Sequence, residues 1–210
     1  MKKEKVSNAV IRRLPRYYRR LTELLNAGTI RISSKSLGES MNLTASQIRQ
    51  DLSCFGEFGQ QGYGYNVESL RNEIAEILGM NQGHTAALLG VGNLGRALME
   101  NFHFDQSGFR LTAAFDVDPA VVGHEIAGIK IRPIEELDEY LKQNPTSVGI
   151  LTVPRAVAPS LSEKLIEGGI KGIWNFTNIE LNITTPGIIV ENVHFSDSLL
   201  ALSYLISEAI

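Results

Sequence analysis

The sequence predicts an α/β protein in two folded parts, an N-terminal winged helix-turn-helix and a C-terminal Rossmann-like, doubly wound parallel sheet. Three observations lead to this prediction. Apolar residues recur every three or four positions over the first 55 residues, a glycine-rich stretch with aromatic residues follows, and strand-like and helix-like segments then alternate. We expect domain boundaries at 1–80 and 81–194, with a separate apolar segment at 195–210.

Charge is distributed unevenly along the chain. The net charge of the 210 residues is −3, but residues 1–78 carry +4 and residues 79–210 carry −7. Eight Lys and Arg residues lie within residues 1–20, where Glu4 is the only acidic residue. Such a basic patch is expected for contact with nucleic-acid phosphates. A solvated basic surface or a disordered arm would have the same composition, so the motifs must decide between them.

Composition excludes several classes of protein. The longest apolar runs, 86–92 and 187–190, are shorter than the roughly 18 residues of a membrane span, and no signal-like leader is visible. We therefore expect a cytoplasmic protein with no membrane partner. One cysteine, Cys54, cannot form an intrachain disulfide, and the four histidines lack metal-ligand spacing, so we expect no metal site. A half-buried, structural Cys54 is expected, and a reactive thiol is the alternative.

The first two helices are predicted from apolar spacing and end signals. The first should span 14–27, with Pro15 in its first turn and Gly28 at its end. A short second helix is predicted over 33–41, with a serine at its start as the cap. The apolar positions of the first helix are Leu14, Tyr17, Tyr18, Leu21, Leu24 and Leu25.

The third helix has the clearest start signal. Thr44 and Gln47 fit a capping box, in which the hydroxyl and the amide each satisfy a backbone N–H, and the helix should run to about Phe55. Its apolar face holds Ile48 and Leu52, whereas the opposite face is short, polar and basic. Side chains of that kind hydrogen-bond base edges and phosphates. The predicted DNA contacts, with arginines of the first helix included, are Arg12, Arg13, Arg16, Thr44, Ser46, Gln47, Arg49, Gln50 and Ser53.

A hairpin is predicted after the third helix. Glycines at 56, 59, 62 and 64 are interleaved with the aromatic residues Phe58, Tyr63 and Tyr65. This stretch is too rich in glycine for a helix and suits a tight hairpin. Three helices followed by a hairpin make a winged helix-turn-helix.

Strand and helix signals alternate through the second part of the chain. A connecting helix is predicted over 66–78, and the second domain begins after residues 79–83. Alternation of this kind indicates a parallel, doubly wound sheet. The predicted strands are 84–89, 111–115, 147–151, 172–176 and 187–190, and the predicted helices are 94–101, 134–142 and 158–167.

The final segment, 196–208, is too apolar for a helix that stands alone in water. It needs something to cover it, most simply another subunit. Its apolar residues are Leu199, Leu200, Leu202, Tyr204, Leu205 and Ile206.

A glycine motif marks the first strand-to-helix turn of the second domain. Residues 90–95 match G-x-G-x-x-G, where the glycines allow a tight turn, approach of a pyrophosphate and close packing of helix on strand. Asp116 follows 21 residues after Gly95, where a carboxylate can accept the ribose hydroxyls of NAD(H) and would repel the phosphate of NADP. A turn without ligand, or a coenzyme A or nucleotide ligand, is the alternative. The predicted cofactor-binding residues are Gly90, Val91, Gly92, Asn93, Leu94, Gly95, Asp116, Thr152 and Pro154.

Other candidate residues of the second domain lie in loops. Residues 152–154 follow a predicted strand end and could line the nicotinamide side of the crevice, although an ordinary strand exit has the same appearance. Asp118 is expected to cap a helix before Pro119. Loop histidines, such as His194, are more often solvated than catalytic.

Four motifs, in this order along the chain, closely resemble the family of redox-sensing transcriptional repressors called Rex. They are R-L-P-x-Y-Y-R from Arg13, Q-I-R-x-D-L-S-x-F-G from Gln47, G-Y-G-Y-x-V from Gly62 and G-V-G-N-L-G from Gly90. The resemblance covers essentially the whole chain, and four motifs in register are far more specific than the glycine loop alone.

The resemblance implies a homodimer that binds palindromic double-stranded operators when NAD⁺ prevails and releases them when NADH binds. It implies that the C-terminal helix is exchanged between subunits, and that Arg19 and Asp197 couple the two sites. Gln61 takes the place of a basic wing residue that contacts DNA in the family. Residues 100–103 lack the family's tyrosine, which is the partner of that aspartate.

Two other functional classes fit the sequence less well than a ligand-gated repressor does. An NAD-dependent dehydrogenase would need a proton donor or base and a substrate domain, whereas the second domain is a minimal Rossmann unit without such a pairing. A scaffold protein would not explain the glycine loop with its carboxylate. The sequence therefore predicts a repressor and not an enzyme, with no catalytic residues.

Overall fold

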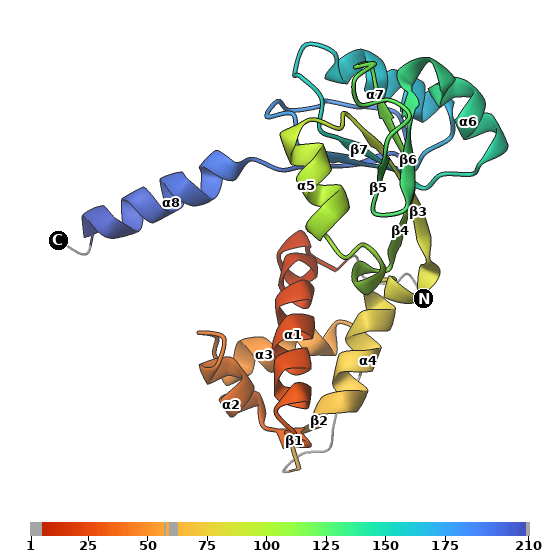
Figure 1. Cartoon of the computed structure of the whole chain (residues 1–210). Coiled ribbons are helices and arrows are strands. Elements are labelled where there is room, and N and C mark those ends of the chain that lie inside the picture. The colour runs from red at the N-terminus through yellow and green to blue at the C-terminus, as the bar shows by residue number, and fades with distance from the viewer. Residues whose placement is uncertain (1–5, 57, 59–62, 209–210) are drawn as a thin grey trace. The chain divides into compact units, whose positions relative to one another are not determined.

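The computed structural model describes residues 6–56, 58 and 63–208. It divides into two compact units, Met1–Asn81 and Gln82–Ile210, and most of their elements are labelled in Figure 1. The predicted boundary at residue 80 lies beside this division, and the segment 195–210 is grouped with the second unit.

Each helix of the first unit begins at a polar side chain that caps its first turn. The helices are α1 (Asn8–Asn26), α2 (Ser34–Glu39), α3 (Ala45–Ser53) and α4 (Val67–Ile77). Their caps accept a hydrogen bond from the backbone N–H three residues later, which satisfies a group without a partner inside the helix. The capping residues are Ser7, Ser33, Thr44 and Asn66.

Helix α1 starts six residues earlier than predicted, so Pro15 lies inside the helix and not in its first turn. Proline removes one hydrogen bond to the preceding turn, which is tolerated here because Pro15 is on the exposed side, where water can reach the released carbonyl. The Ser7 cap sets the true start, and Val10 is buried one turn before the apolar pattern becomes regular.

The first unit has its own core, to which every described helix of the unit contributes. Helix α1 packs on α4, and α2 packs on α3 (Figure 1). Strand β1 (Arg31–Ile32) pairs antiparallel with β2 (Tyr65–Asn66), which follows the glycine-rich stretch predicted as a hairpin. Residues 57 and 59–62 of that stretch lie outside the described residues. Gly64 has a φ of +69°, and a Cβ there would lie 2.7 Å from the carbonyl oxygen of Ile32, so this position requires glycine.

The second unit is built on a mixed sheet with the strand order β5-β6-β4-β3-β7-β8-β9 among the described residues. All neighbours are parallel except β5 and β6. When β5 is left out and the other six strands are renumbered 1 to 6 in chain order, their order across the sheet is 3-2-1-4-5-6. This is the strand order of a dinucleotide-binding doubly wound sheet. The strands are β3 (His84–Leu89), β4 (Phe109–Asp116), β5 (Glu125–Ile126), β6 (Ile129–Pro133), β7 (Val148–Leu151), β8 (Gly172–Asn175) and β9 (Ile189–Asn192).

The β5–β6 hairpin was not predicted from the sequence. Its turn, Ala127 and Gly128, has positive φ at both residues, which matches the twist of a two-residue hairpin. Alanine is an unusual choice for this conformation, so the usual turn signal is missing.

Helices cover the two faces of the sheet unequally. Helices α6 (Leu137–Gln143) and α7 (Ala158–Glu167) share a core with Ala87 and Leu89 on one face, and α5 (Asn93–Asn101) packs on the other. The predicted helix 134–142 begins with a 3₁₀ turn over Ile134–Glu136. No helix connects β8 to β9 in this fully described stretch, so the α5 face of these strands lacks a helical cover.

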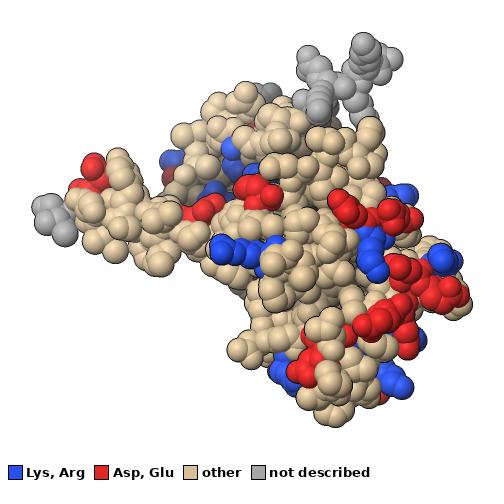
Figure 2. All heavy atoms as spheres, turned by 90° about the horizontal axis from the view of Figure 1, so that it is seen from above, with Lys and Arg blue, Asp and Glu red and all other residues tan. Residues whose placement is uncertain are grey.

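Helix α8 (Phe195–Glu208) is apolar and exposed. Among its described residues none is buried, and Leu199, Leu200 and Leu205 are each more than 60% exposed. Figure 2 shows its atoms mostly in tan, in keeping with the absence of Lys and Arg from its sequence. Beyond a ring contact of Phe195 with Phe176 at its start, the described chain therefore leaves this apolar helix uncovered.

Replacing Ile48 with Ala should lower the free energy of unfolding of the first unit by about 2–5 kcal/mol, because its side chain is fully buried and its loss leaves a cavity. Urea denaturation followed by circular dichroism measures this. Ile30→Ala, at a position that is 74% exposed, is the matched control and should cost less than about 0.5 kcal/mol. Equal losses in the two variants would contradict this packing.

Candidate functional site

The predicted cofactor residues meet at the carboxyl edge of the sheet, where β3 and β7 lie side by side. The helices that follow these strands, α5 and α7, cover opposite faces, which makes these strand ends the switch point where doubly wound sheets form their ligand crevice. Thr152 crosses it: its hydroxyl donates to the carbonyl oxygen of Gly90 at 2.6 Å, and its N–H donates to that of Leu89 at 2.9 Å. Pro154 lies on the same loop and is exposed.

Each of the three motif positions is occupied by glycine for a different physical reason. Gly90 has a φ of +93°, and a Cβ there would lie 2.8 Å from the carbonyl oxygen of Thr152. A Cβ on Gly95 would lie only 2.0 Å from the carbonyl oxygen of Gly90, so α5 packs on the strand end at glycine distance. Beside Gly92, in contrast, the described chain leaves open space on the side where a pyrophosphate would approach.

The start of α5 suits an anion. Gly92 is its N-cap, and no described side chain caps the helix, so backbone N–H groups and the positive end of the helix dipole face the crevice. Asn93 is exposed and Leu94 half-buried at this end, whereas Val91 is buried beneath it.

Asp116 ends β4 and ties it to the glycine loop. One carboxylate oxygen accepts from the backbone N–H of Val91 at 2.5 Å, and the other accepts from that of Asp118 at 2.9 Å. The carboxylate is therefore held next to the loop in the position predicted for contact with a ribose. Asp118 caps a turn, accepting from the N–H of Ala120, and does not start the helix that we predicted. Its backbone continues as a turn toward β5.

The outer face of α3 carries the side chains predicted to contact DNA. Ser46, Arg49, Gln50 and Ser53 are exposed, whereas Ile48 and Leu52 are buried. Arg49 donates to the hydroxyl of Ser34 on α2 at 3.0 Å. Thr44 is exposed and caps α3 by accepting from the N–H of Gln47 at 3.1 Å.

Two of the predicted DNA contacts turn inward. Arg13 donates from Nε and Nη2 to the carboxylate of Asp51, at 2.6 and 2.8 Å. Gln47 also donates to Asp51, at 2.7 Å, and does not reach back to Thr44 as a complete capping box requires. Sequence reasoning missed Asp51, although a carboxylate between Ile48 and Leu52 on an apolar helix face was a signal for it.

The inward cluster changes the ionisation of its members. Burial alone would raise the pKa of Asp51, but hydrogen bonds from Arg13, Tyr17 and Gln47 outweigh it, so that this pKa is lowered. Burial, and the hydrogen bond that Tyr17 donates to Asp51, raise the pKa of Tyr17 above its usual range. The pair is thus held as carboxylate and phenol.

The remaining predicted residues occupy several places. Arg12, Arg16 and Arg19 are exposed on α1, and Arg16 donates to the carbonyl of Met41 at 3.2 Å. Asp197 is exposed in the first turn of α8, in the other unit. Gln61 lies outside the described residues. Cys54, at the end of α3, is exposed, which contradicts the half-buried position that we expected.

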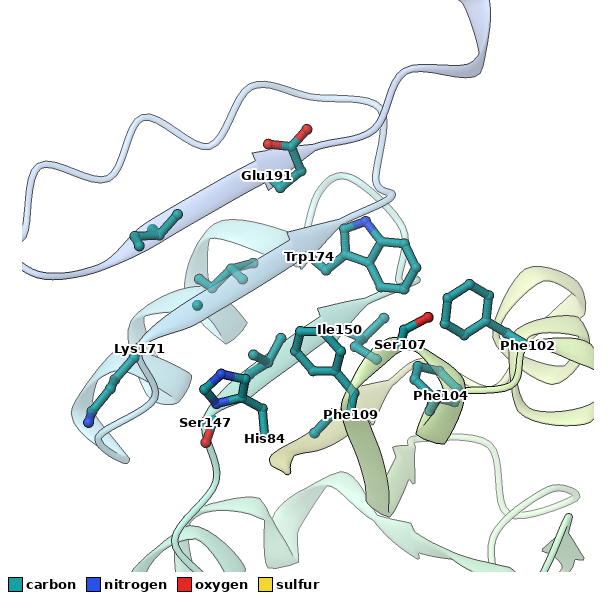
Figure 3. A pocket seen from close by; sticks show the side chains of 15 residues that line it. His84, Phe102, Phe104, Ser107, Phe109, Ser147, Ile150, Lys171, Trp174 and Glu191 are labelled. Carbon is teal, nitrogen blue, oxygen red and sulfur yellow. The ribbon is translucent and has the colours of Figure 1, made fainter. Parts of the chain in front are cut away.

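A separate apolar groove lies on the α5 face of the sheet, with a volume of about 510 Å³ (Figure 3). It is distinct from the cofactor crevice because it includes the first residues of β3, β4, β7, β8 and β9, at the opposite ends of these strands. Phe102, Phe104, Phe109 and Trp174 converge on it in Figure 3. Its lining is completed by His84, Ala86, Ser107, Ser147, Val148, Ile150, Lys171, Gly172, Ile173, Ile189 and Glu191.

An aromatic row joins this groove to the start of α8. The rings of Phe102 and Trp174 lie 5.4 Å apart, those of Trp174 and Phe176 lie 4.6 Å apart, and those of Phe176 and Phe195 lie 6.1 Å apart. Phe102 follows α5, so the helix that begins at the glycine loop ends at the groove.

The described residues contain neither a membrane-spanning helix nor a metal cluster. No helix there is both long and apolar enough to cross a membrane. In that same portion of the chain, His, Cys, Asp and Glu side chains form no cluster that could hold a metal ion.

Family models match both units. Residues 5–53 match the model called "Putative DNA-binding protein N-terminus", and residues 81–179 match the model called "CoA binding domain". Together with the fold, these matches define a transcriptional regulator that joins a winged helix to a Rossmann-like domain.

Named relatives identify the family. The chain is 48% identical to the redox-sensing transcriptional repressor Rex of Clostridium beijerinckii, over 99% of this chain and 98% of the relative. It is 49% identical to Rex of Caldicellulosiruptor saccharolyticus, over 99% and 94% of the two chains. The chain therefore belongs to the Rex family of redox-sensing transcriptional repressors, and it is a regulator and not an enzyme.

Solved structures of a Rex-family repressor, RSP, have the same fold. RSP in complex with β-NAD⁺ and operator DNA matches with a TM-score of 0.91 and 46% identity, over 98% of this chain and 94% of RSP. RSP in complex with β-NADH matches with a TM-score of 0.90 and 44% identity, over 97% and 95%. The predicted fold, with its winged helix and Rossmann-like sheet, is thus confirmed.

Gly95→Ala should destabilise the second unit by about 1–3 kcal/mol or more, because its Cβ would overlap a backbone oxygen that cannot move freely. Gly92→Ala, which meets open space, is the matched control and should change stability by less than about 1 kcal/mol. Thermal unfolding measures both. A destabilised Gly92→Ala beside an unaffected Gly95→Ala would show that the loop packs differently.

Proposed function

We propose that this chain represses transcription by binding palindromic operator DNA as a homodimer, and that NADH releases it. The observation that carries the proposal is the pairing, in one chain, of an exposed polar face on α3 with a glycine-lined crevice that presents Asp116. RSP supports it, since that repressor has been solved with β-NAD⁺ and operator DNA and with β-NADH. We also propose that the protein acts in the cytoplasm, together with the operator DNA that it binds.

In the proposed cofactor site, residues 90–95 cradle the pyrophosphate of NAD⁺ or NADH against the start of α5. Asp116 accepts the ribose hydroxyls, and Thr152 and Pro154 line the nicotinamide side. The position of Asp116 favours NAD(H) over coenzyme A and NADP, because a carboxylate at that point repels a phosphate on the same ribose.

In the proposed DNA interface, the outer residues of α3 enter the major groove. Arg49 and Gln50 have the donor and acceptor groups that distinguish guanine and adenine, and Ser46 and Ser53 can reach either base. The residues proposed to contact the phosphate backbone of the DNA are Arg12, Arg16 and Thr44. Gln61, in the predicted hairpin, is proposed as a further contact. Arg13 and Gln47 are only partly exposed and donate hydrogen bonds to Asp51, so we assign them a supporting role.

The proposed dimer follows from two unpartnered apolar surfaces in one chain. Helix α8 is exposed along its length, and the groove that contains Trp174 is lined almost entirely by apolar atoms. Both surfaces are buried when α8 of each subunit packs into the groove of the other subunit. This exchange gives a closed two-fold assembly. We therefore propose 195–210 as an exchanged dimerisation segment that follows a winged-helix domain at 1–80 and a cofactor domain at 81–194.

The coupling must rest on unequal binding of the two redox forms. NAD⁺ carries a positive nicotinamide ring and NADH does not, so a nearby carboxylate can distinguish them. NADH then has to favour a dimer in which the recognition helices no longer match major grooves about 34 Å apart. Arg19 and Asp197 are proposed to carry this coupling, one from each unit.

Titrating NADH against a fixed excess of NAD⁺ should weaken binding to the operator duplex of the RSP complex by about 5–150-fold, the range typical of coupled sites. Fluorescence anisotropy of the labelled duplex measures this. Operator affinity that is the same at every NADH concentration would rule out the redox response.

Asp116→Ala should weaken NADH binding at least roughly 10-fold, because hydrogen bonds to a charged acceptor are lost. Isothermal titration calorimetry measures the affinity, and Glu163→Ala, an exposed carboxylate on α7, is the control that should bind normally. Gly92→Ala should fold but bind NADH weakly, because its methyl group fills the space of the pyrophosphate. Normal NADH affinity in both Asp116→Ala and Gly92→Ala would remove this crevice from the cofactor site.

The double variant Leu202→Glu, Leu205→Glu should weaken dimerisation at least roughly 100-fold, because two apolar side chains of α8 can no longer be buried. Sedimentation measures the dimer, and emission of Trp174, the single tryptophan of the chain, should shift to the red as the groove becomes wet. Ser203→Glu on the same helix is the control. A dimer that survives the double variant unchanged would show that α8 is not its interface.

A further inference from the structure

The buried carboxylate of Asp51 is unusual for its place in the fold. It lies on the inner face of α3, between Ile48 and Leu52, and none of its surface is exposed. Burial of a carboxylate costs several kcal/mol unless hydrogen bonds and an opposite charge compensate for it. An apolar residue would fill this position at no such cost, so the carboxylate requires an explanation beyond packing.

The carboxylate joins two turns of α1 to two turns of α3. Oδ2 accepts from Nε of Arg13 and from the hydroxyl of Tyr17, both at 2.6 Å. Oδ1 accepts from Nη2 of Arg13 at 2.8 Å and from Nε2 of Gln47 at 2.7 Å. Arg13 and Tyr17 are one helical turn apart on α1, and Gln47 and Asp51 are one turn apart on α3. Both oxygens are therefore satisfied from both helices.

The directionality of these bonds determines what they contribute. Apolar contacts of Ile48 and Leu52 are not directional and allow α3 to roll, whereas a planar guanidinium that binds a carboxylate through two parallel bonds allows one orientation. Buried ion pairs add little net stability compared with apolar residues of similar volume. The main effect of the cluster is thus on the rotation of α3 about its axis.

That rotation bears directly on DNA contact. Arg49 and Gln50 immediately precede Asp51, and both are exposed on the outer face. A roll of about 20° moves a side chain at a helix radius of roughly 5–6 Å by about 2 Å. Such a shift is enough to break a bidentate contact with a base edge, which depends on hydrogen-bond geometry.

We propose that Asp51 is a positioning residue that sets the rotation of α3 and thereby the sequence specificity of DNA binding. Arg13 and Tyr17 hold the carboxylate from α1, and Gln47 holds it from α3. This inference rests on the proposed DNA-binding function. It predicts that loss of the carboxylate impairs discrimination between sequences and leaves attraction to the phosphate backbone intact.

The ionisation of the cluster agrees with this role. Hydrogen bonds hold the pKa of Asp51 below its ordinary value although burial opposes them, and the pKa of Tyr17 is raised. Asp51 is therefore a hydrogen-bond acceptor and Tyr17 a donor at neutral pH. The hydrogen bonds around Asp51 thus persist at physiological pH.

The test compares Asp51→Asn with wild type on two duplexes, the operator of the RSP complex and a scrambled duplex of the same length and composition. Operator affinity should fall at least roughly 10-fold, while affinity for the scrambled duplex and the salt dependence of binding change little, because phosphate contacts are retained. Glu39→Gln, an exposed carboxylate of α2 in the same unit, is the control and should keep the wild-type ratio.

Tyr17→Phe keeps the ring and removes one hydrogen bond, so it tests the same idea if Asp51→Asn fails to fold. Its ratio of operator to scrambled affinity should fall by a few-fold, with NADH affinity unchanged. A wild-type ratio in a folded variant, or an equal loss on both duplexes, would overturn the inference. Wild-type protein that does not prefer the operator would instead overturn the proposed function on which the inference rests.

Discussion

The contact between Gly95 and the carbonyl oxygen of Gly90 is the constraint on which the second unit depends. Only the absence of a side chain lets α5 start this close to the end of β3. The helix then spans from the cofactor crevice at its first residue to the apolar groove at Phe102, beyond its last. The close packing of α5 on β3 therefore sets the position of the cofactor crevice relative to the apolar groove. A ligand that binds at the start of α5 contacts a helix that also borders this groove.

The first unit solves a different physical problem. A recognition helix must be held firmly, yet its outer face has to stay polar and unencumbered. The cluster at Asp51 meets both needs because its donors come from α1 and from the inner side of α3. Arg13 and Gln47, which the sequence predicted to contact DNA, instead donate hydrogen bonds to Asp51. Some arginines of α1 are thus exposed to solvent, whereas Arg13 forms an ion pair with Asp51 inside the unit.

Local features were predictable because they depend on neighbours in sequence. The cap at Thr44, the glycine turn at 90–95 and the position of Asp116 all follow from spacing within one strand-turn-helix unit or between adjacent strands. The family followed from motifs of the same kind. The start of α1 at Asn8 was missed because its cap precedes the regular apolar pattern, and the β5–β6 turn was missed because Ala127 is rarely used in that conformation.

The sequence by itself determined the class of fold, the glycine crevice, the polar face of α3 and the apolar character of α8. The tertiary structure decided which polar residues face outward, since two partners of Asp51, Tyr17 and Arg13, lie 34 and 38 residues away on another helix. It also decided where the groove lies, because the starts of five strands far apart in sequence converge there and no helix of the described chain covers them. Periodicity describes one element at a time, whereas pairing of buried charges and the shape of an uncovered face arise only when elements pack together.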